Sequence, residues 1–268
     1  MTVVTLPGGE TIWYRIEGKG APLLHIHGSA FGHRNFEKLT PLMTPHVQVI
    51  DFDLPGFGES TGAAAKDMSG LAALVAQFIR AAGFERVHVH GTSFGAMVGL
   101  ALAANHPELI DRLVLSCFLT RYDQAARVMR GTWKRAARDS GMAAVADLTA
   151  VAGFARSYHE RPEAAAQMET MRTAFARTQP EAFIAGTEMI ERTDLTSLVA
   201  IVKAPTLLLG GDEDNMTPYQ PAGSGAGFAQ IRAMVPGCEV SILTQCGHYL
   251  VIEQPEEAAR RIVRFLSR

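Results

Sequence analysis

The chain has 268 residues, of which 47% are hydrophobic and 19% charged, so it can bury a large core as one globular unit. Its formal net charge of -2 argues against binding to nucleic acid or to an anionic membrane surface, and it favours a small neutral or weakly charged substrate. The start lacks the basic and apolar regions of a signal peptide, and no stretch is long enough to span a bilayer. Three scattered cysteines, Cys117, Cys238 and Cys246, are typical of free thiols in a reducing compartment, so we expect a cytoplasmic protein.

The hydrophobic pattern predicts strands that alternate with helices. This order indicates an α/β fold with a mostly parallel eight-stranded sheet covered on both faces, and with an antiparallel hairpin at the start. The active site of such a sheet lies at the carboxyl ends of its strands. We expect strands at residues 2–6, 11–16, 22–26, 47–51, 86–90, 111–117, 205–210 and 239–243, and helices at 33–43, 67–82, 94–105, 219–234 and 254–266.

Residues 120–196 interrupt this alternation, because they contain no good strand and are rich in alanine, arginine and methionine. They are predicted to form four helices, with breaks near Gly141, Pro162 and Pro180. The chain is therefore expected to consist of a core, residues 1–119 and 197–268, and a helical insertion at residues 120–196. Apolar residues at helical spacing in this insertion are more often packed than exposed to a pocket, and the sequence does not say which of them face a substrate.

The segment Gly91-Thr92-Ser93-Phe94-Gly95 follows a β-branched run and opens a helical stretch of small residues. A tight strand-to-helix turn of this kind holds a serine hydroxyl out of the backbone and places the first amides of the helix beside it. Glycine-flanked serines also occur by chance in ordinary turns and helix caps. Ser93 is thus a candidate nucleophile whose assignment depends on suitable partners downstream.

Suitable partners follow in the order acid, then histidine. The apolar run at residues 204–209 leads into a loop that contains Asp212, Glu213 and Asp214. The short strand at residues 239–243 leads into a loop that contains His248. The chain order serine, acid, histidine is the one that accompanies a serine on such a turn.

These motifs together resemble the α/β-hydrolase fold family, from about Thr11 to Phe265. The matching segments are His27-Gly28-Ser29, Asp53 through Ser60, Gly91 through Gly95, and the loops with Asp214 and His248.

The acid loop of that family typically reads G-x-x-D-x-x-x-P, which Gly211 through Pro218 matches with Asp214 as the acid. The resemblance implies that Ser93 is the nucleophile, His248 the base, and Asp214 the group that orients the imidazole. It also implies an oxyanion hole made by the backbone N–H groups of Phe94 and Ser29, with Ala30 as the competing second donor.

The same resemblance implies that the insertion is a helical cap that lies over the serine and selects the substrate. Its methionine and phenylalanine residues favour a substrate with a hydrophobic portion.

His25, His88 and His90 fall within predicted strands, and we interpret them as packed, hydrogen-bonded residues. Asp51 and Asp53 are interpreted as structural. Because no carboxylate or cysteine cluster accompanies the His-x-His pairs, neither a metal nor another cofactor is expected.

Hydrolysis of a carboxylic ester or lactone through an acyl-enzyme on Ser93 is the favoured reaction. Serine at this position differs from the aspartate of haloalkane dehalogenases and epoxide hydrolases. Carbon–carbon bond hydrolases of aromatic catabolism share a stretch like Gln245 to His248, but they usually carry a glycine-rich oxyanion loop and a tryptophan where this chain has Tyr249.

Other chemistry on the same fold also stays open, because fold alone does not fix function. Perhydrolase activity and hydroxynitrile cleavage use the same serine and histidine. Some members with an intact triad are small-molecule receptors with slow turnover. The expected partner in each case is a small molecule, with neither nucleic acid nor a membrane involved, and the sequence leaves a homodimer open.

Overall fold

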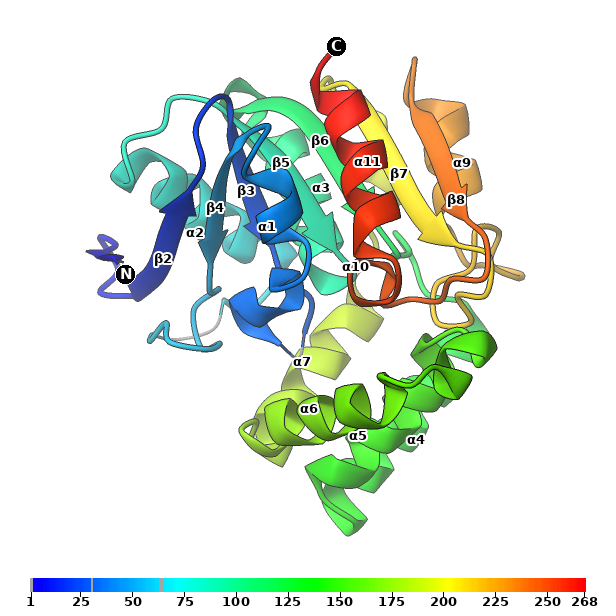
Figure 1. The fold of residues 1–268 in the computed structure, drawn as a ribbon. Coiled ribbons are helices and arrows are strands. Elements are labelled where there is room, and N and C mark those ends of the chain that lie inside the picture. Colours follow the sequence, from blue (N-terminus) through cyan, green and yellow to red (C-terminus); the bar gives the residue numbers. More distant parts are fainter. Residues whose placement is uncertain (1, 30, 63–64) are drawn as a thin grey trace.

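The computed structural model describes residues 2–29, 31–62 and 65–268, which fold around one eight-stranded sheet (Figure 1). The strands lie in the order β1-β2-β4-β3-β5-β6-β7-β8. The β1–β2 and β2–β4 pairs are antiparallel, and all other neighbours are parallel. The strand bounds are Thr2–Thr5 (β1), Thr11–Glu17 (β2), Pro22–Ile26 (β3), Gln48–Phe52 (β4), Val87–Thr92 (β5), Ile110–Ser116 (β6), Thr206–Gly211 (β7) and Glu239–Leu243 (β8).

The burial of the strands follows from their place in the sheet. Every residue of β5 and β7 is buried, as in parallel strands that helices cover on both faces. The edge strand β1 is mostly exposed, with Val3 56% accessible. The expected eight-stranded, mostly parallel sheet with an initial antiparallel hairpin is thus confirmed.

Helices cover both faces of the sheet, and alternate strand residues contact opposite layers (Figure 1). Leu24 and Ile26 belong to one hydrophobic cluster between the sheet and its helices, whereas Leu23 belongs to a second cluster on the opposite face. The helices of the first layer are α2 (Met68–Ala81), α3 (Phe94–Asn105), α8 (Thr196–Val199) and α9 (Phe228–Met234). The others are α1 (Thr40–Met43), the short α10 (Leu250–Glu253) and α11 (Pro255–Leu266).

The prediction of one continuous helix at residues 33–43 is wrong. The structure has a 3-10 helix, Gly32–Phe36, and then the separate α1 with Pro41 in its first turn. The carboxylate of Asp53 accepts the backbone N–H of His33 at 2.6 Å and so holds the 3-10 helix against the end of β4. The structural interpretation of Asp53 agrees with this contact.

The helix expected at residues 219–234 is also too long, because only its last part forms α9. Pro221, Gly223, Gly225 and Gly227 occupy the preceding segment, and Gly223 has a φ of 53°. These residues favour turns over a regular helix.

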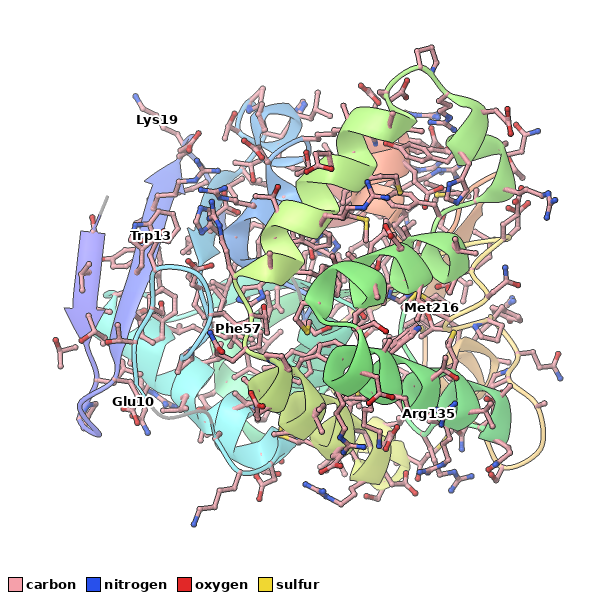
Figure 2. All side chains as sticks on the ribbon, turned by 90° about the horizontal axis from the view of Figure 1, so that it is seen from below. Glu10, Trp13, Lys19, Phe57, Arg135 and Met216 are labelled. Carbon is pink, nitrogen blue, oxygen red and sulfur yellow. The ribbon has the colours of Figure 1, made fainter. Side chains whose placement is uncertain are left out.

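The insertion contains the four expected helices, which Figure 1 shows at the end of the sheet toward which the parallel strands point. Gly141 separates the first two with a φ of 82°, and Pro180 begins the fourth. Figure 2 shows this end of the molecule from below, with Arg135 labelled on α4. The bounds are Gln124–Asp139 (α4), Met142–Gly153 (α5), Ala164–Ala176 (α6) and Pro180–Arg192 (α7), with a 3-10 helix, Arg156–Glu160, between α5 and α6. Within the described ranges, no helix combines the length and the apolar character needed to cross a bilayer.

Candidate active site

Ser93 lies on the sharp turn between β5 and α3. Its backbone has φ 55° and ψ -117°, a combination that non-glycine residues rarely adopt. A Cβ atom at Gly91 would collide with the backbone of Gly95, and one at Gly95 would collide with the carbonyl oxygen of Ile26. Both glycines are therefore needed for the backbone to turn this closely, which explains the G-x-S-x-G pattern.

The structure brings together Ser93, Asp214 and His248. The Nε2 atom of His248 lies 2.9 Å from the Oγ atom of Ser93, and its Nδ1 atom lies 3.0 Å from the Oδ2 atom of Asp214. His248 is 4% exposed and Asp214 is 5% exposed, while Ser93 is half-buried. When Nδ1–H donates to the carboxylate, Nε2 has its lone pair directed at the serine hydroxyl.

The two other acidic residues of the same loop contact different groups. The carboxylate of Asp212 accepts the backbone N–H of Cys246 at 3.3 Å. The carboxylate of Glu213 accepts the backbone N–H of Arg156 at 2.9 Å. The imidazole of His248 thus pairs with Asp214, the acid that the loop pattern favoured.

Hydrogen bonds keep the carboxylate of Asp214 ionised. Its Oδ1 accepts the backbone N–H groups of Met216 and Thr217, both at 2.9 Å, and its Oδ2 accepts the hydroxyl of Thr217 at 2.5 Å. Burial would raise the pKa of Asp214, but the His248 imidazole and these hydrogen bonds hold it below its ordinary value. An ionised carboxylate is what an imidazole needs beside it in order to carry a positive charge.

Cys117 lies next to this pair, a neighbour that sequence reasoning did not find. The ligand atoms of Cys117, Asp214 and His248 lie within 4.8 Å of one another, a spacing that a metal ion could use. However, Asp214 and His248 are already hydrogen-bonded to each other at 3.0 Å, and burial and the charge of Asp214 raise the pKa of the Cys117 thiol well above its ordinary value. We interpret Cys117 as a packed, protonated residue.

The loop that carries Ser29 lies against the serine turn. A Cβ atom at Gly28 would be 3.6 Å from the Cβ atom of Ser93. His27 holds the loop in place, because its Nδ1–H donates to the carbonyl of Gly28 at 2.7 Å and its Nε2 accepts the N–H of Leu54 at 3.0 Å. Burial lowers the pKa of His27, which keeps the ring neutral for this pair of contacts.

The two expected oxyanion donors belong to segments that adjoin Ser93. Phe94 is the first residue of α3, directly after Ser93, and Ser29 lines the same pocket as Ser93. Ala30, the competing donor, lies outside the described residues.

The core and the insertion both line the pocket in front of Ser93. Met216 and Tyr249 come from the loops that carry Asp214 and His248. Phe175 and Phe183 are among the phenylalanine residues of the insertion that favour a hydrophobic substrate, whereas the sequence did not indicate Arg130 and Thr149. The residues from the insertion are Arg130, Trp133, Thr149, Phe175 and Phe183.

The signal for Arg130 is present in the sequence. Ala126, Arg130, Trp133 and Ala137 are the buried residues of α4, and they recur at the spacing of one helix face. Arg130 is therefore a charged residue within an otherwise apolar face.

The end of α5 is bonded directly to the loop that carries His248. The backbone N–H of His248 donates to the carbonyl of Gly153 at 2.6 Å. The carboxylate of Glu253 accepts the N–H groups of Ala155 and Gly247, both at 3.1 Å, and thus joins the two segments. Burial raises the pKa of Glu253 to about 7, although these hydrogen bonds favour its charged form.

The histidines of the strands are packed, and two of them are hydrogen-bonded as expected. His25 donates from Nδ1 to Asp51 at 2.9 Å, and His90 shares a hydrogen bond of 2.9 Å with Ser116. For His88 the packing is confirmed, but its Nδ1 has no hydrogen-bond partner among the described residues.

Comparison with known proteins finds relatives along almost the whole chain. A 2-hydroxy-6-oxo-6-(2'-aminophenyl)hexa-2,4-dienoic acid hydrolase from Metapseudomonas resinovorans is 26% identical over 274 residues, covering 97% of this chain and 89% of the relative. A pimeloyl-[acyl-carrier protein] methyl ester esterase from Vibrio vulnificus is 24% identical over 260 residues, covering 95% of this chain and 98% of the relative.

Solved structures show the same fold. The enol-lactonase from Burkholderia xenovorans LB400 superposes with a TM-score of 0.86 over all of both chains, at 24% identity. The model of the alpha/beta hydrolase family matches residues 23–261, which include both sides of the turn at Ser93 and the loops of Asp214 and His248. The chain therefore belongs to the alpha/beta hydrolase family.

Proposed function

We propose that this protein is a serine hydrolase that cleaves a carboxylic ester or lactone through an acyl-enzyme on Ser93. The observation that carries the proposal is the continuous series of contacts from the Ser93 hydroxyl through His248 to Asp214. A nucleophile beside a base that a third group orients is the arrangement that acyl transfer requires.

In the first half of the proposed reaction, His248 Nε2 accepts the proton of Ser93 as Oγ attacks the carbonyl carbon. The carbonyl oxygen becomes an oxyanion, to which the N–H groups of Ser29 and Phe94 donate. One such donor typically contributes about 3 kcal/mol to transition-state stabilisation. The imidazolium then gives its proton to the leaving oxygen, and the acyl group stays on Ser93.

In the second half, water takes the place of the alcohol. His248 accepts a proton from the water as its oxygen attacks the acyl carbon, and it returns a proton to Ser93 Oγ as the acid leaves. Asp214 remains ionised throughout and stabilises the imidazolium. A lactone follows the same two halves, except that the leaving oxygen stays attached to the acyl portion.

We further propose that the insertion, residues 120–196, is a cap that selects the substrate, while residues 1–119 and 197–268 form the catalytic core. Trp133, Phe175 and Phe183 line the pocket from the insertion, which supports a substrate with a hydrophobic portion. The named esterase from Vibrio vulnificus and the enol-lactonase from Burkholderia xenovorans support ester or lactone chemistry.

We also propose a cytoplasmic location, because all three cysteines are free thiols, as is usual in a reducing compartment.

One observation favours a second function, hydrolysis of a carbon–carbon bond. The relative from Metapseudomonas resinovorans, a dienoic acid hydrolase by name, matches 97% of this chain. The same serine and histidine would serve that reaction with a carbon leaving group.

The test is the hydrolysis rate of para-nitrophenyl esters with acyl chains of increasing length, measured on the wild type, Ser93→Ala and His248→Ala. We expect a clear chain-length optimum in the wild type and loss of turnover in both variants. A fluorophosphonate probe should add its phosphonyl group to the wild type, seen by intact mass, but not to Ser93→Ala. Near-wild-type rates in either variant would refute the assignment, and inactivity toward all the esters would favour carbon–carbon cleavage.

A further inference from the structure

Arg130 is a buried cation in the pocket that contains Ser93 and His248. It comes from the middle of α4, and only 6% of its surface is exposed. The guanidinium lies over two aromatic rings, with its Cζ atom 4.4 Å from the ring centre of Tyr122 and 5.4 Å from that of Trp133. Such cation–π contacts hold the group in place but do not neutralise its charge.

The guanidinium has few hydrogen-bond partners of its own. Among the described residues its single hydrogen bond runs from Nη2 to the hydroxyl of Tyr122, at 2.7 Å. A guanidinium has five N–H donors, and the one on Nε of Arg130 is buried without any partner in the described chain. The described part of the structure also contains no ion pair to Arg130, in contrast to Lys134 on the same helix, which pairs with Glu191 at 2.7 Å.

The neighbouring carboxylate at the start of α4 is directed elsewhere. Asp123 accepts the backbone N–H of Ala126 at 2.9 Å and that of Ala222 at 3.0 Å. Tyr249, which also lines the pocket, is half-buried, and the burial of its hydroxyl raises the pKa of that group, so it supplies no negative charge. An arginine this deeply buried normally pairs with an anion, because an uncompensated buried charge is strongly destabilising.

We propose that Arg130 binds a carboxylate of the substrate, so that the substrate is an ester or lactone that also carries a free carboxylate. This inference rests on the proposed function, because it concerns the substrate of the same pocket. Guanidinium groups pair with planar carboxylates through parallel N–H donors. Trp133, Phe175 and Phe183 would contact the apolar carbons between the carboxylate and the bond that is cleaved.

The experiment compares two para-nitrophenyl adipates, one with a free carboxylate and one with that group methylated. We expect the wild type to hydrolyse the free acid with a kcat/KM about tenfold or more above that of the neutral ester. Arg130→Met, which keeps the length of the side chain, should lose that preference, so that its kcat/KM for the free acid falls to about its kcat/KM for the neutral ester. The matched control is Arg135→Met, which removes a charge from the exposed side of the same helix and should change neither rate.

A binding measurement separates this inference from the proposed function. Ser93→Ala should bind monomethyl adipate in isothermal titration calorimetry, and the double variant with Arg130→Met should not. If the wild type hydrolyses no ester but this Arg130-dependent binding is seen, the proposed function fails and the carboxylate site stands.

Two results would overturn the carboxylate site. One is a wild type that treats the charged and neutral esters alike. The other is an Arg130→Met variant that slows both esters equally while keeping the wild-type circular dichroism spectrum, since that result means a structural role. If Arg130→Met does not fold, Arg130→Gln is measured instead, and a preference for the free acid as large as that of the wild type would overturn the carboxylate site.

Discussion

The backbone N–H of His248 donates a 2.6 Å hydrogen bond to the carbonyl of Gly153, the last residue of α5. This contact joins the insertion to the residue that we propose as the catalytic base. The orientation of the imidazole therefore depends on how the insertion packs, and a small error in that orientation lowers the rate of a reaction that needs aligned groups.

Replacement of Gly153 by alanine tests this dependence. The new Cβ atom would collide with the ring of Tyr249 and the sulfur of Met216, so we expect kcat on a para-nitrophenyl ester to fall by about tenfold or more. Gly186→Ala in α7 is the control, because a Cβ atom there meets nothing within 4 Å. It should leave kcat unchanged, and equal rates for the two variants would contradict the proposed coupling.

A second prediction separates the acids of the loop after β7. Asp214→Asn should reduce kcat by about 10⁴-fold, because an amide cannot stabilise the charged imidazole. Asp212→Asn should be much milder, since its carboxylate contacts the backbone of Cys246 and not the imidazole. The measurement is kcat for both variants with their circular dichroism spectra, and the reverse order would mean that the acid is misassigned.

The backbone of Ser93 leads to a prediction about stability. A residue held in a rarely populated conformation costs about 1–3 kcal/mol, which glycine would largely avoid. We expect Ser93→Gly to be more stable in urea unfolding than Ser93→Ala by about 1 kcal/mol, with both variants inactive. Ser93→Ala is the matched control because it removes the same hydroxyl but keeps the Cβ atom. Equal unfolding midpoints would show that the turn is not strained.

The raised pKa of Glu253 predicts that the free energy of unfolding depends on pH. Its pKa is raised from an ordinary 4.5 to about 7 in the folded protein, so the folded state holds a proton that the unfolded state releases between these values. The contribution is fully present below pH 4.5 and is lost as the pH rises through about 7, which amounts to about 3 kcal/mol.

The test is urea unfolding of the wild type and Glu253→Gln at several pH values between about 5 and 8. Because glutamine mimics the protonated acid, the wild type should lose about 2.5 kcal/mol relative to the variant across this range. The exposed Glu256, replaced in the same way, should show no such difference. A gap between wild type and Glu253→Gln that stays constant with pH would disprove the titration.

The features that were predictable from the sequence depend on short stretches of chain. The strand β7 contains the apolar run at residues 207–209, and the turn at Ser93 needs Gly91 and Gly95 within five residues, so local patterns are enough to find them. Asp214 and His248 were expected on loops at the carboxyl ends of strands, and parallel strands bring such loops to one edge of the sheet. The structure places their side chains in contact with each other.

The features that were missed depend on packing between distant segments. Ala155 and Glu253 are 98 residues apart, and no local pattern indicates that a carboxylate accepts that particular amide. The spacing along α4 shows that Arg130 lies on the apolar face, but only the packing of α4 places it in the pocket of Ser93. The segment before α9 was misassigned because its three glycines and one proline were outweighed by the helical pattern around them.

The bonds of Glu253 to Ala155 and Gly247 limit how the insertion can be exchanged for another. A chimera that receives a foreign insertion would leave this buried carboxylate without one of its amide donors unless the graft also reproduces the chain path at residues 153–155. The boundary for recombination therefore lies within the insertion, after this junction, and not at residues 120 and 196. Substrate range in this chain should accordingly change more readily by point substitution along α4, α6 and α7 than by replacement of the whole segment.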